Sequence, residues 1–286
     1  MSSILCPNCQ KLISDYVEVC PHCNLKNPAK KQRALRLIGG AHKSFVKTII
    51  TLNVILFIAS YLLPLFIRGD FPSGRGMFGL LPSPSWKSLY LLGWADIRLL
   101  SSGYWWVLIT ATFLHGGVLH VLFNMLWVRD LAPQTEILFS PYKMLIVYIL
   151  SGVCGNLVAV FTPLLGQFIP MIDTRFVPVI GASGAVFGLM GAIVAFGRKR
   201  GGVFGRQLVR QLGMWAVILI GMGFVFPGVS NAAHIGGFIS GFLIGLLLPL
   251  NDTALSRGVF SILGTGLIGV CLLSFVLMVS RIISLV

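Results

Sequence analysis

Long apolar runs without charged residues dominate the chain from residue 48 onward. They occupy residues 48–67, 104–128, 144–172, 176–197, 211–251 and 258–280. A helix needs about 20 apolar residues to cross the hydrocarbon layer of a membrane, so five of these runs predict one span each. The run 211–251 is long enough for two spans, with a turn at Pro227 and Gly228. The pattern therefore predicts an all-α polytopic membrane protein with a six-helix core at 48–250 and one further C-terminal helix within 251–286.

The composition excludes other broad classes of protein. The chain has 286 residues, of which 56% are hydrophobic and 10% are charged. Soluble domains have about 25% charged residues, so this is not a soluble globular protein. A transmembrane barrel is also excluded, because its strands alternate between apolar and polar residues and these runs do not alternate.

The positions of the basic residues predict an orientation. With the N-terminus inside, 16 of the 22 Lys and Arg residues fall on inner segments and 6 on outer ones. Cytoplasmic segments carry an excess of Lys and Arg, so we predict a multi-pass protein of the plasma membrane with a cytoplasmic N-terminus. A basic linker at 27–47 is expected to contact anionic lipid headgroups. Nucleic-acid binding is the alternative for a net charge of +14, and we do not expect it.

The first 26 residues contain two pairs of cysteines with metal-binding spacing. The candidate ligands are Cys6, Cys9, Cys20 and Cys23. Two such pairs, each on a tight turn, supply four thiolates for a tetrahedral zinc site. We therefore predict a structural Zn²⁺ ion in a zinc ribbon at 1–26, with His22 as a bystander. Two disulfides are the alternative, which a reducing cytoplasm disfavours.

Polar side chains that a membrane span rarely contains fall in three of the predicted helices. They are His115, His120 and Asn124 in the second helix, Ser183 in the fourth and His234 in the sixth. A single buried His or Asn is typical of a hydrogen bond between packed helices, and a single serine of a hydrogen bond back to its own helix. Together they are candidates for function, because ionisable groups are costly inside a bilayer. In the predicted orientation the three helices run in the same direction, which puts all of these side chains except His115 in the outer half of the membrane.

Glycines at four-residue spacing line the fourth and sixth predicted helices. They are Gly184 and Gly188 on the fourth, and Gly237, Gly241 and Gly245 on the sixth. Such stripes let two helix backbones approach closely, so we expect the two helices to touch. That contact would bring the hydroxyl of Ser183 within hydrogen-bond reach of His234. Phe187 lies one turn after the serine on the same face and is expected to stack on the imidazole.

A serine and a histidine in contact are the smallest unit for nucleophilic acyl transfer. The imidazole takes the hydroxyl proton during the attack and returns it to the leaving amine. No Asp or Glu lies within any predicted span, so we predict a catalytic dyad of Ser183 and His234. His120 and Asn124 lie four residues apart on one helix face. With the amide of Ser183, they are candidate donors to the oxyanion.

The sequence resembles the rhomboid intramembrane serine proteases. The resemblance rests on three motifs in matching order, which are His115-Gly116-Gly117-Val118-Leu119-His120-Val121-Leu122-Phe123-Asn124, Gly181-Ala182-Ser183-Gly184 and Ala233-His234-Ile235-Gly236-Gly237. It extends over the six-helix core at 48–250. It implies a serine endopeptidase that cuts single-span membrane proteins near the outer face and needs no cofactor for catalysis. It also implies supporting roles for Gly181, His115 and Phe187.

The resemblance carries further expectations and meets two departures. The outer loop at 68–103 would lie half-embedded in the membrane interface, and the fifth helix would gate lateral access of the substrate. An amide inside a helix is shielded by its hydrogen bond, so substrates are expected to carry Gly or Pro near the cut and a small residue before it. The family commonly has Arg where Val107 follows Trp106, and often Tyr where Phe187 stands.

Two other functions remain open at this point. A catalytically inactive relative would bind membrane clients without cutting them, and such relatives typically lose the serine or the histidine, both of which are present here. A transporter would use the buried histidines as a proton relay. The lack of acidic residues in the spans and of two matching halves disfavours a transporter.

Overall fold

The chain forms two compact units, Met1–Ser44 and Phe45–Val286. The computed structural model describes residues 3–6, 11–30, 44–66, 83–166, 177–226, 228–251 and 253–285. The predictions on Cys9, on Pro227, on linker residues 31–43 and on loop residues 68–82 lie outside the described part of the chain.

The N-terminal unit contains a small antiparallel sheet. Strand β1 (Ser3–Leu5) pairs with strand β2 (Leu12–Ser14), and Ile4 lies opposite Ile13. The hydrophobic cluster of this unit has only three buried members among the described residues, which are Cys6, Ile13 and Cys20. Two strands with so small a core are marginally stable in water, so this unit needs a further source of folding free energy.

Helices build the membrane unit. They are α2 (Val46–Leu62), α3 (Trp86–Leu91), α4 (Ile97–Ser101), α5 (Val107–Thr110), α6 (Val118–Phe139), α7 (Pro141–Leu165), α8 (Ser183–Arg200), α9 (Gly202–Val225), α10 (Asn231–Leu247) and α11 (Ala254–Leu285), with 3₁₀ turns η1 (Leu63–Leu65) and η2 (Ala111–Phe113). Among the described residues, α2 and α6 to α11 each have 17 residues or more. They correspond to the predicted six-helix core and the additional C-terminal helix, which confirms the predicted fold class.

Length and composition alone identify fewer spans than this. In the part of the chain that the structure describes, four helical segments are long and apolar enough to cross a membrane: α2 with η1, α7, α9 and α11. The bent pair made by α5 with η2 and α6 would be a fifth span. Helix α8 ends in three basic residues, and α10 has only 17 residues. Helix α8 lies at the centre of the unit, where its residues from Gly184 to Gly197 are all buried and need no apolar surface toward lipid.

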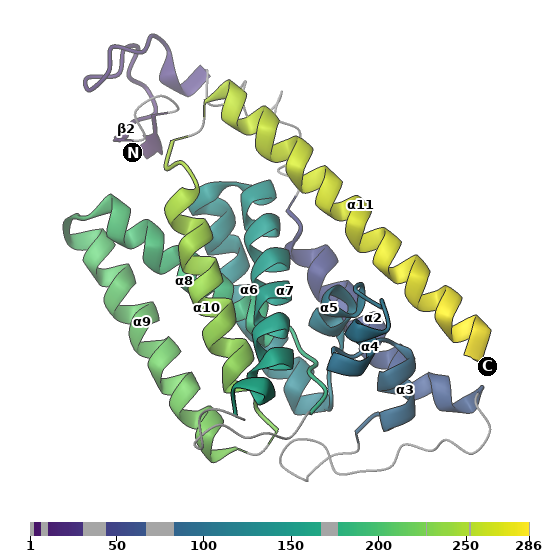
Figure 1. Cartoon of the computed structure of the whole chain (residues 1–286). Helices are drawn as coiled ribbons and strands as arrows, with labels where there is room; N and C mark the ends of the chain where they lie inside the picture. Colours follow the sequence, from purple (N-terminus) through teal and green to yellow (C-terminus); the bar gives the residue numbers. More distant parts are fainter. Residues whose placement is uncertain are drawn as a thin grey trace. The chain divides into compact units, whose positions relative to one another are not determined.

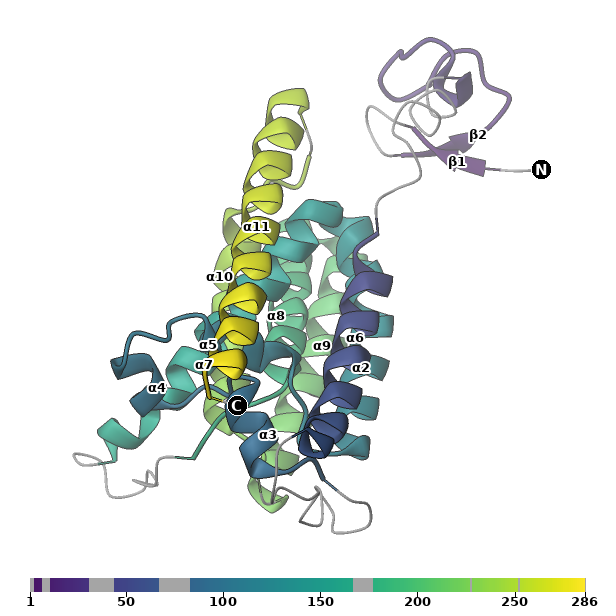
Figure 2. The ribbon, with the colours of Figure 1, turned by 90° about the vertical axis from the view of Figure 1, so that its right-hand side faces the viewer.

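Helices α7, α8 and α10 are in mutual contact and form the centre of the membrane unit. Helix α9 packs on α8, whereas α11 packs on α7 and α5. Figure 1 shows α9 and α11 on opposite sides of this centre. The turned view in Figure 2 shows α2 alongside α6, which it contacts.

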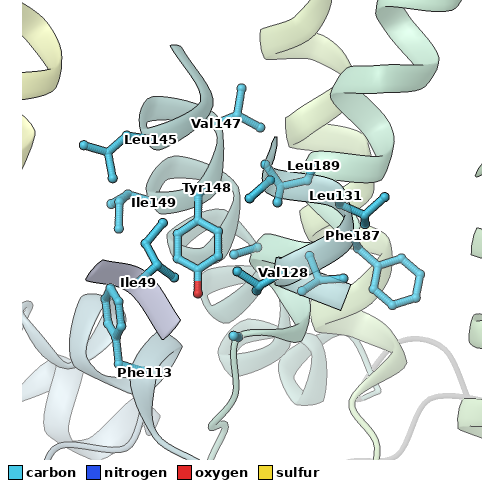
Figure 3. Packing of buried hydrophobic residues seen from close by; sticks show 14 of the residues in the cluster. Ile49, Phe113, Val128, Leu131, Leu145, Val147, Tyr148, Ile149, Phe187 and Leu189 are labelled. Carbon is cyan, nitrogen blue, oxygen red and sulfur yellow. The ribbon is translucent and has the colours of Figure 1, made fainter. Parts of the chain in front are cut away.

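Tyr148 on α7 lies in the middle of the hydrophobic core. Its side chain is fully buried, and Figure 3 shows Ile49 of α2, Phe113 of η2 and Val128 of α6 around it. The ring centroids of Phe113 and Tyr148 are 6.2 Å apart. Burial of these large side chains against one another stabilises the arrangement of four segments that are distant in sequence.

The prediction of one continuous second span at 104–128 is wrong. Helix α5 and η2 end at Phe113, α6 begins at Val118, and the two parts are bent by 92°. The backbone is extended at Leu114 and again at Gly117, which interrupts the helical hydrogen bonds. His115 therefore lies in the turn between the two parts of this bent pair and not within a helix.

Two helix boundaries also differ from the apolar runs. The fourth long helix, α8, begins at Ser183 and not at 176, because the segment before it is extended and Val179 forms a β-bridge with Ala95. Helix α6 continues to Phe139, beyond the run that ends at 128. Hydropathy marks the part of a helix that lies in hydrocarbon, whereas backbone hydrogen bonds decide where the helix ends.

Candidate active site

Three glycines mark the place where α7, α8 and α10 meet. A Cβ at Gly237 would overlap the carbonyl of Gly184, and a Cβ at Gly155 would lie 2.7 Å from the carbonyl oxygen of Ala233. The predicted contact between the glycine stripes of α8 and α10 is therefore confirmed. The part played by Gly155 on α7 was missed, although the small residues Ser151, Gly152 and Gly155 follow the spacing typical of close helix packing.

Ser183 is the first residue of α8. The segment before it forms backbone hydrogen bonds with two other segments. Val179 exchanges two backbone hydrogen bonds with Ala95, of 2.8 and 2.9 Å, and the Gly181 amide donates to the Ala111 carbonyl at 2.9 Å. Gly181 has φ +127°, a conformation that favours glycine. The amide of Ser183 lies in the first turn of α8, where backbone N–H groups have no partner within the helix.

His234 lies in the first turn of α10, on the neighbouring helix. Ser230 caps this helix by accepting a hydrogen bond from the amide of Ala233 at 3.3 Å. The imidazole is 7% exposed and stacks on the ring of Phe187, with centroids 4.3 Å apart and planes 16° apart. The stacking predicted from the spacing of Ser183 and Phe187 is thus present, and it holds His234 beside the start of α8.

One nitrogen of the His234 imidazole, Nδ1, is buried and has no hydrogen-bond partner among the described residues. A direct hydrogen bond between the Ser183 hydroxyl and His234 is not among those that the described residues form. The contact of the dyad therefore remains a prediction.

His120 points into the same space as Ser183. Its Nδ1 accepts a hydrogen bond from the amide of Gly116 at 3.3 Å, so a neutral ring carries its proton on Nε2 and can donate from there. A Cβ added at Gly181 would lie 2.7 Å from this Nε2 and 3.7 Å from the Ser183 hydroxyl. The absence of a side chain at Gly181 keeps that small space open.

Asn124 and His115 both contact His120. The Asn124 amide nitrogen donates to the carbonyl of His120 at 2.9 Å, which uses one of its two N–H groups. His115 is fully buried, and its ring meets that of His120 edge-on with centroids 4.9 Å apart. Neither ring nitrogen of His115 has a hydrogen-bond partner among the described residues.

Residues 102–251, just over half of the chain, match the Rhomboid domain family. The chain belongs to the rhomboid family. Curated relatives include "RHOMBOID-like protein 5" of Arabidopsis thaliana, 32% identical over 60% of this chain and 53% of the relative. The "Rhomboid protease GluP" of Bacillus subtilis (strain 168) is 30% identical over 59% of this chain and 31% of the relative.

The similarity to these two relatives covers only part of each of them. The matched segment spans from about a third to about half of their length. Family membership and the apolar helices together establish an integral, multi-pass membrane protein. The named relatives include a rhomboid protease, so the family supports protease activity in outline.

Outside the rhomboid core, the N-terminal unit brings three of the four predicted zinc ligands together. The Sγ atoms of Cys6, Cys20 and Cys23 all lie within 4.8 Å of one another, and those of Cys6 and Cys23 are 3.6 Å apart. Four sulfurs at 2.3 Å from a tetrahedral zinc would be about 3.8 Å apart, so these three positions fit the metal. No disulfide joins Cys6, Cys20 and Cys23 to one another. Cys9 lies outside the described residues.

The two cysteine pairs share one backbone hydrogen bond. The amide of Cys6 donates to the carbonyl of Lys11, five residues later, at 2.9 Å, and the amide of Cys20 donates in the same way to that of Leu25 at 2.9 Å. Asn24, which follows Cys23, has φ +55° and so turns the chain sharply. The same bond at both cysteine pairs fits a site to which each pair contributes two thiolates.

Two buried polar residues of the membrane unit that the sequence did not single out bond to other elements of the unit. Asn156 on α7 is buried and donates to the Leu108 carbonyl at 2.9 Å and to the Thr112 hydroxyl at 3.1 Å, which ties α7 to α5 and η2. Arg281 near the end of α11 is 6% exposed and binds the outer loop. Asn156 lies within an apolar run and Arg281 at the edge of one, but the sequence does not predict the partner of either residue.

Proposed function

We propose that this rhomboid protein is an intramembrane serine endopeptidase that uses Ser183 as nucleophile and His234 as general base and acid. The observation that carries the proposal is the glycine junction of α7, α8 and α10, which places the first turn of α10 against the first turn of α8. The stack of Phe187 on His234 supports the same assignment, because Phe187 lies one turn after Ser183 on α8.

The reaction proceeds in two acyl-transfer steps. The Ser183 hydroxyl oxygen attacks the carbonyl carbon of the scissile peptide, and its proton passes to Nε2 of His234. The tetrahedral intermediate breaks the carbon–nitrogen bond, and His234 returns the proton to the leaving amine. Water then attacks the resulting ester while His234 accepts a proton from it. Return of that proton to the Ser183 oxygen releases the second product.

The oxyanion would be stabilised by donors that converge on the space beside Gly181. His120 offers its Nε2 proton there, because Nδ1 already accepts from Gly116. The amide of Ser183 is available at the start of α8, where the positive end of the helix dipole also favours a negative charge. Asn124 retains one N–H group and is a further candidate donor to the oxyanion.

A fluorophosphonate probe tests the nucleophile. We expect the probe to label the full-length protein in membranes and to fail to label a Ser183→Ala variant. Ser240→Ala is the matched control, because that hydroxyl also lies on α10 and is already bonded to the carbonyls of Gly236 and Gly237. Equal labelling of the wild type and Ser183→Ala would eliminate the proposed nucleophile. No labelling of either protein would favour the inactive, client-binding alternative.

The proposed substrates are single-span membrane proteins cut near the outer face, at a place weakened by Gly or Pro. Two cations at one end of the unit support the orientation with that end inside: Lys199 donates to the carbonyls of Leu246 and Leu248, at 2.8 and 2.6 Å, and Lys143 to that of Pro249 at 3.3 Å. Reporter fusions at the C-terminus of α11 check the orientation, with an external signal expected. The plasma membrane as location rests on the same charge pattern.

A further inference from the structure

Arg281, close to the end of α11, is buried against the outer loop of the rhomboid core. One of its guanidinium nitrogens donates to the carbonyl of Tyr90 at 2.8 Å. The guanidinium carbon lies 4.3 Å from the ring centroid of Tyr90, 5.0 Å from that of Tyr104 and 6.0 Å from that of Trp106. The end of α11 lies beside α3 in both views of the unit (Figures 1 and 2).

This burial is unusual for an arginine near a helix end. Such a residue normally extends its charged group into water, and burying a charge is costly unless it is paired. No carboxylate among the described residues pairs with Arg281. The charge is instead met by one carbonyl and the faces of three aromatic rings, which attract a cation. Tyr104 and Trp106 also meet edge to face, at 5.9 Å, so the rings support one another.

A continuous set of contacts leads from these rings to the segment before Ser183. Trp106 packs so closely on Gly93 that a Cβ there would lie 2.5 Å from the indole. The carbonyl of Gly93 in turn accepts a hydrogen bond from the Thr110 hydroxyl at 2.7 Å.

Two residues after Gly93, the chain pairs with the segment that leads into α8. Ala95 forms the β-bridge with Val179, and Val179 lies two residues before Gly181. Gly181 lines the space shared by His120 and the Ser183 hydroxyl. A shift of the outer loop at Tyr90 would therefore be passed through one bridge to the start of α8.

We propose that Arg281 is a positioning residue, which makes α11 a working part of the protease. Arg281 fixes the rings of Tyr90, Tyr104 and Trp106. Through them it holds the Ala95–Val179 bridge, and so the position of Gly181 relative to His120 and Ser183. Its consequence for catalysis rests on the proposed function, whereas its consequence for the bridge does not.

Other contacts keep α11 attached when Arg281 is changed. The rings of Phe275 and Phe113 meet edge to face, with centroids 5.5 Å apart. The ammonium nitrogen of Lys143 lies 4.9 Å from the ring centroid of Phe260. Gly264 packs against the ring of Tyr142, where a Cβ would lie 2.5 Å from the nearest carbon. Loss of the guanidinium is thus expected to loosen the outer end of α11 without removing the helix from the unit.

Hydrogen exchange and substrate kinetics on full-length Arg281→Gln in lipid nanodiscs test the proposal. Amides in peptides that cover residues 89–96 and 177–183 should exchange about tenfold faster, because the bridge then opens more often. With a transmembrane substrate, kcat should fall about ten- to a hundredfold while KM changes less than about twofold, since a small displacement acts on the transition state. Arg281→Lys should behave like Arg281→Gln, because an ammonium cannot stack flat on the rings while reaching Tyr90.

Arg257→Gln is the matched control, since this arginine lies on the same helix and its side chain is exposed. It should leave both measurements unchanged. Unchanged exchange in Arg281→Gln, or full recovery in Arg281→Lys, would overturn the proposal whatever the protein's activity. Faster exchange in a protein that labels with no probe would instead uphold the positioning role and reject the protease. If Arg281→Gln fails to insert, Tyr104→Leu removes one ring and should give the same exchange pattern.

Discussion

Gly181 has no side chain, and this leaves the space between the His120 ring and the Ser183 hydroxyl open. In Gly181→Ala, the new Cβ would lie 2.7 Å from Nε2 of His120, and the φ of +127° would be strained. We expect kcat to fall about a hundredfold, with membrane insertion retained, when cleavage of a transmembrane substrate is measured. Gly103→Ala is the control, because Gly103 also has a positive φ, of +87°, but has no atom within 4 Å of the added Cβ. An equal loss in both variants would attribute the effect to backbone strain alone.

His234 and Asn124 should differ in how much activity their loss removes. His234→Ala takes away the group that accepts the serine proton, so cleavage should fall to background. Asn124→Ala removes one oxyanion donor, which costs about 3 to 4 kcal/mol of barrier. Its activity should therefore remain measurable in a single-turnover assay. Full activity of His234→Ala would be fatal to the dyad.

Residue identities in the site could be predicted from the sequence, but their partners could not. Spacing placed Ser183 and Phe187 on one helix face, and the stack on His234 follows from it. The bond from Gly116 to His120 depends on the turn between η2 and α6, which no helical periodicity describes. The prediction of a continuous helix through His115 is wrong for the same reason. Arg281 could not be matched to Tyr90, because their separation of 191 residues carries no local signal.

At the scale of helices, the contact of α8 and α10 depends on glycines that no other residue can replace. A Cβ at Gly241 would overlap the backbone of Gly188, so Gly241→Ala should destabilise the unit by about 1 to 3 kcal/mol, as overpacking does. The thermal transition in detergent measures this loss. Gly221→Ala on α9 is the control, since nothing lies within 4 Å of its added Cβ, and its transition should stay within the error of the wild type. Equal transitions in both variants would contradict the close packing.

Helix identities were predictable because each long apolar run must be helical in a membrane. Helix ends were less so. The start of α8 is set by the bridge from Val179 to Ala95, a contact between segments far apart in sequence. The break before α6 lies where the backbone is extended at Leu114 and Gly117, within an otherwise apolar run. The hydrophobic pattern predicts neither the bridge nor the break.

At the scale of the whole molecule, the two units should respond differently to metal removal. We expect one zinc per chain by elemental analysis, and none after all four cysteines of the N-terminal unit are changed to serine. A strong chelator should unfold that unit, because metal binding supplies most of its folding free energy. The thermal transition of the membrane unit should not move, since its core is separate. Stoichiometric zinc in the quadruple variant would refute the site.

The division into a metal-binding unit and a membrane unit was readable from composition, since cysteine pairs and apolar runs do not overlap along the chain. The arrangement of helices within the membrane unit was readable only in part. Glycine stripes announced the contact between α8 and α10, whereas the position of α11 depends on ring contacts such as Phe275 with Phe113. Aromatic residues are abundant in every span, so their pairing cannot be read from their presence.

The short length of α10 has a consequence for the lipid around the protein. Its 17 residues rise only about 25 Å, less than the hydrocarbon thickness of about 30 Å. Its outward residues Ile239, Leu243 and Leu247 are 51%, 54% and 84% exposed, so lipid tails reach this helix. Such hydrophobic mismatch is relieved by local thinning of the bilayer. A neighbouring helix that drifts into the thinned zone would push one of its ends into the headgroups, where water loosens its backbone before any protein surface touches it.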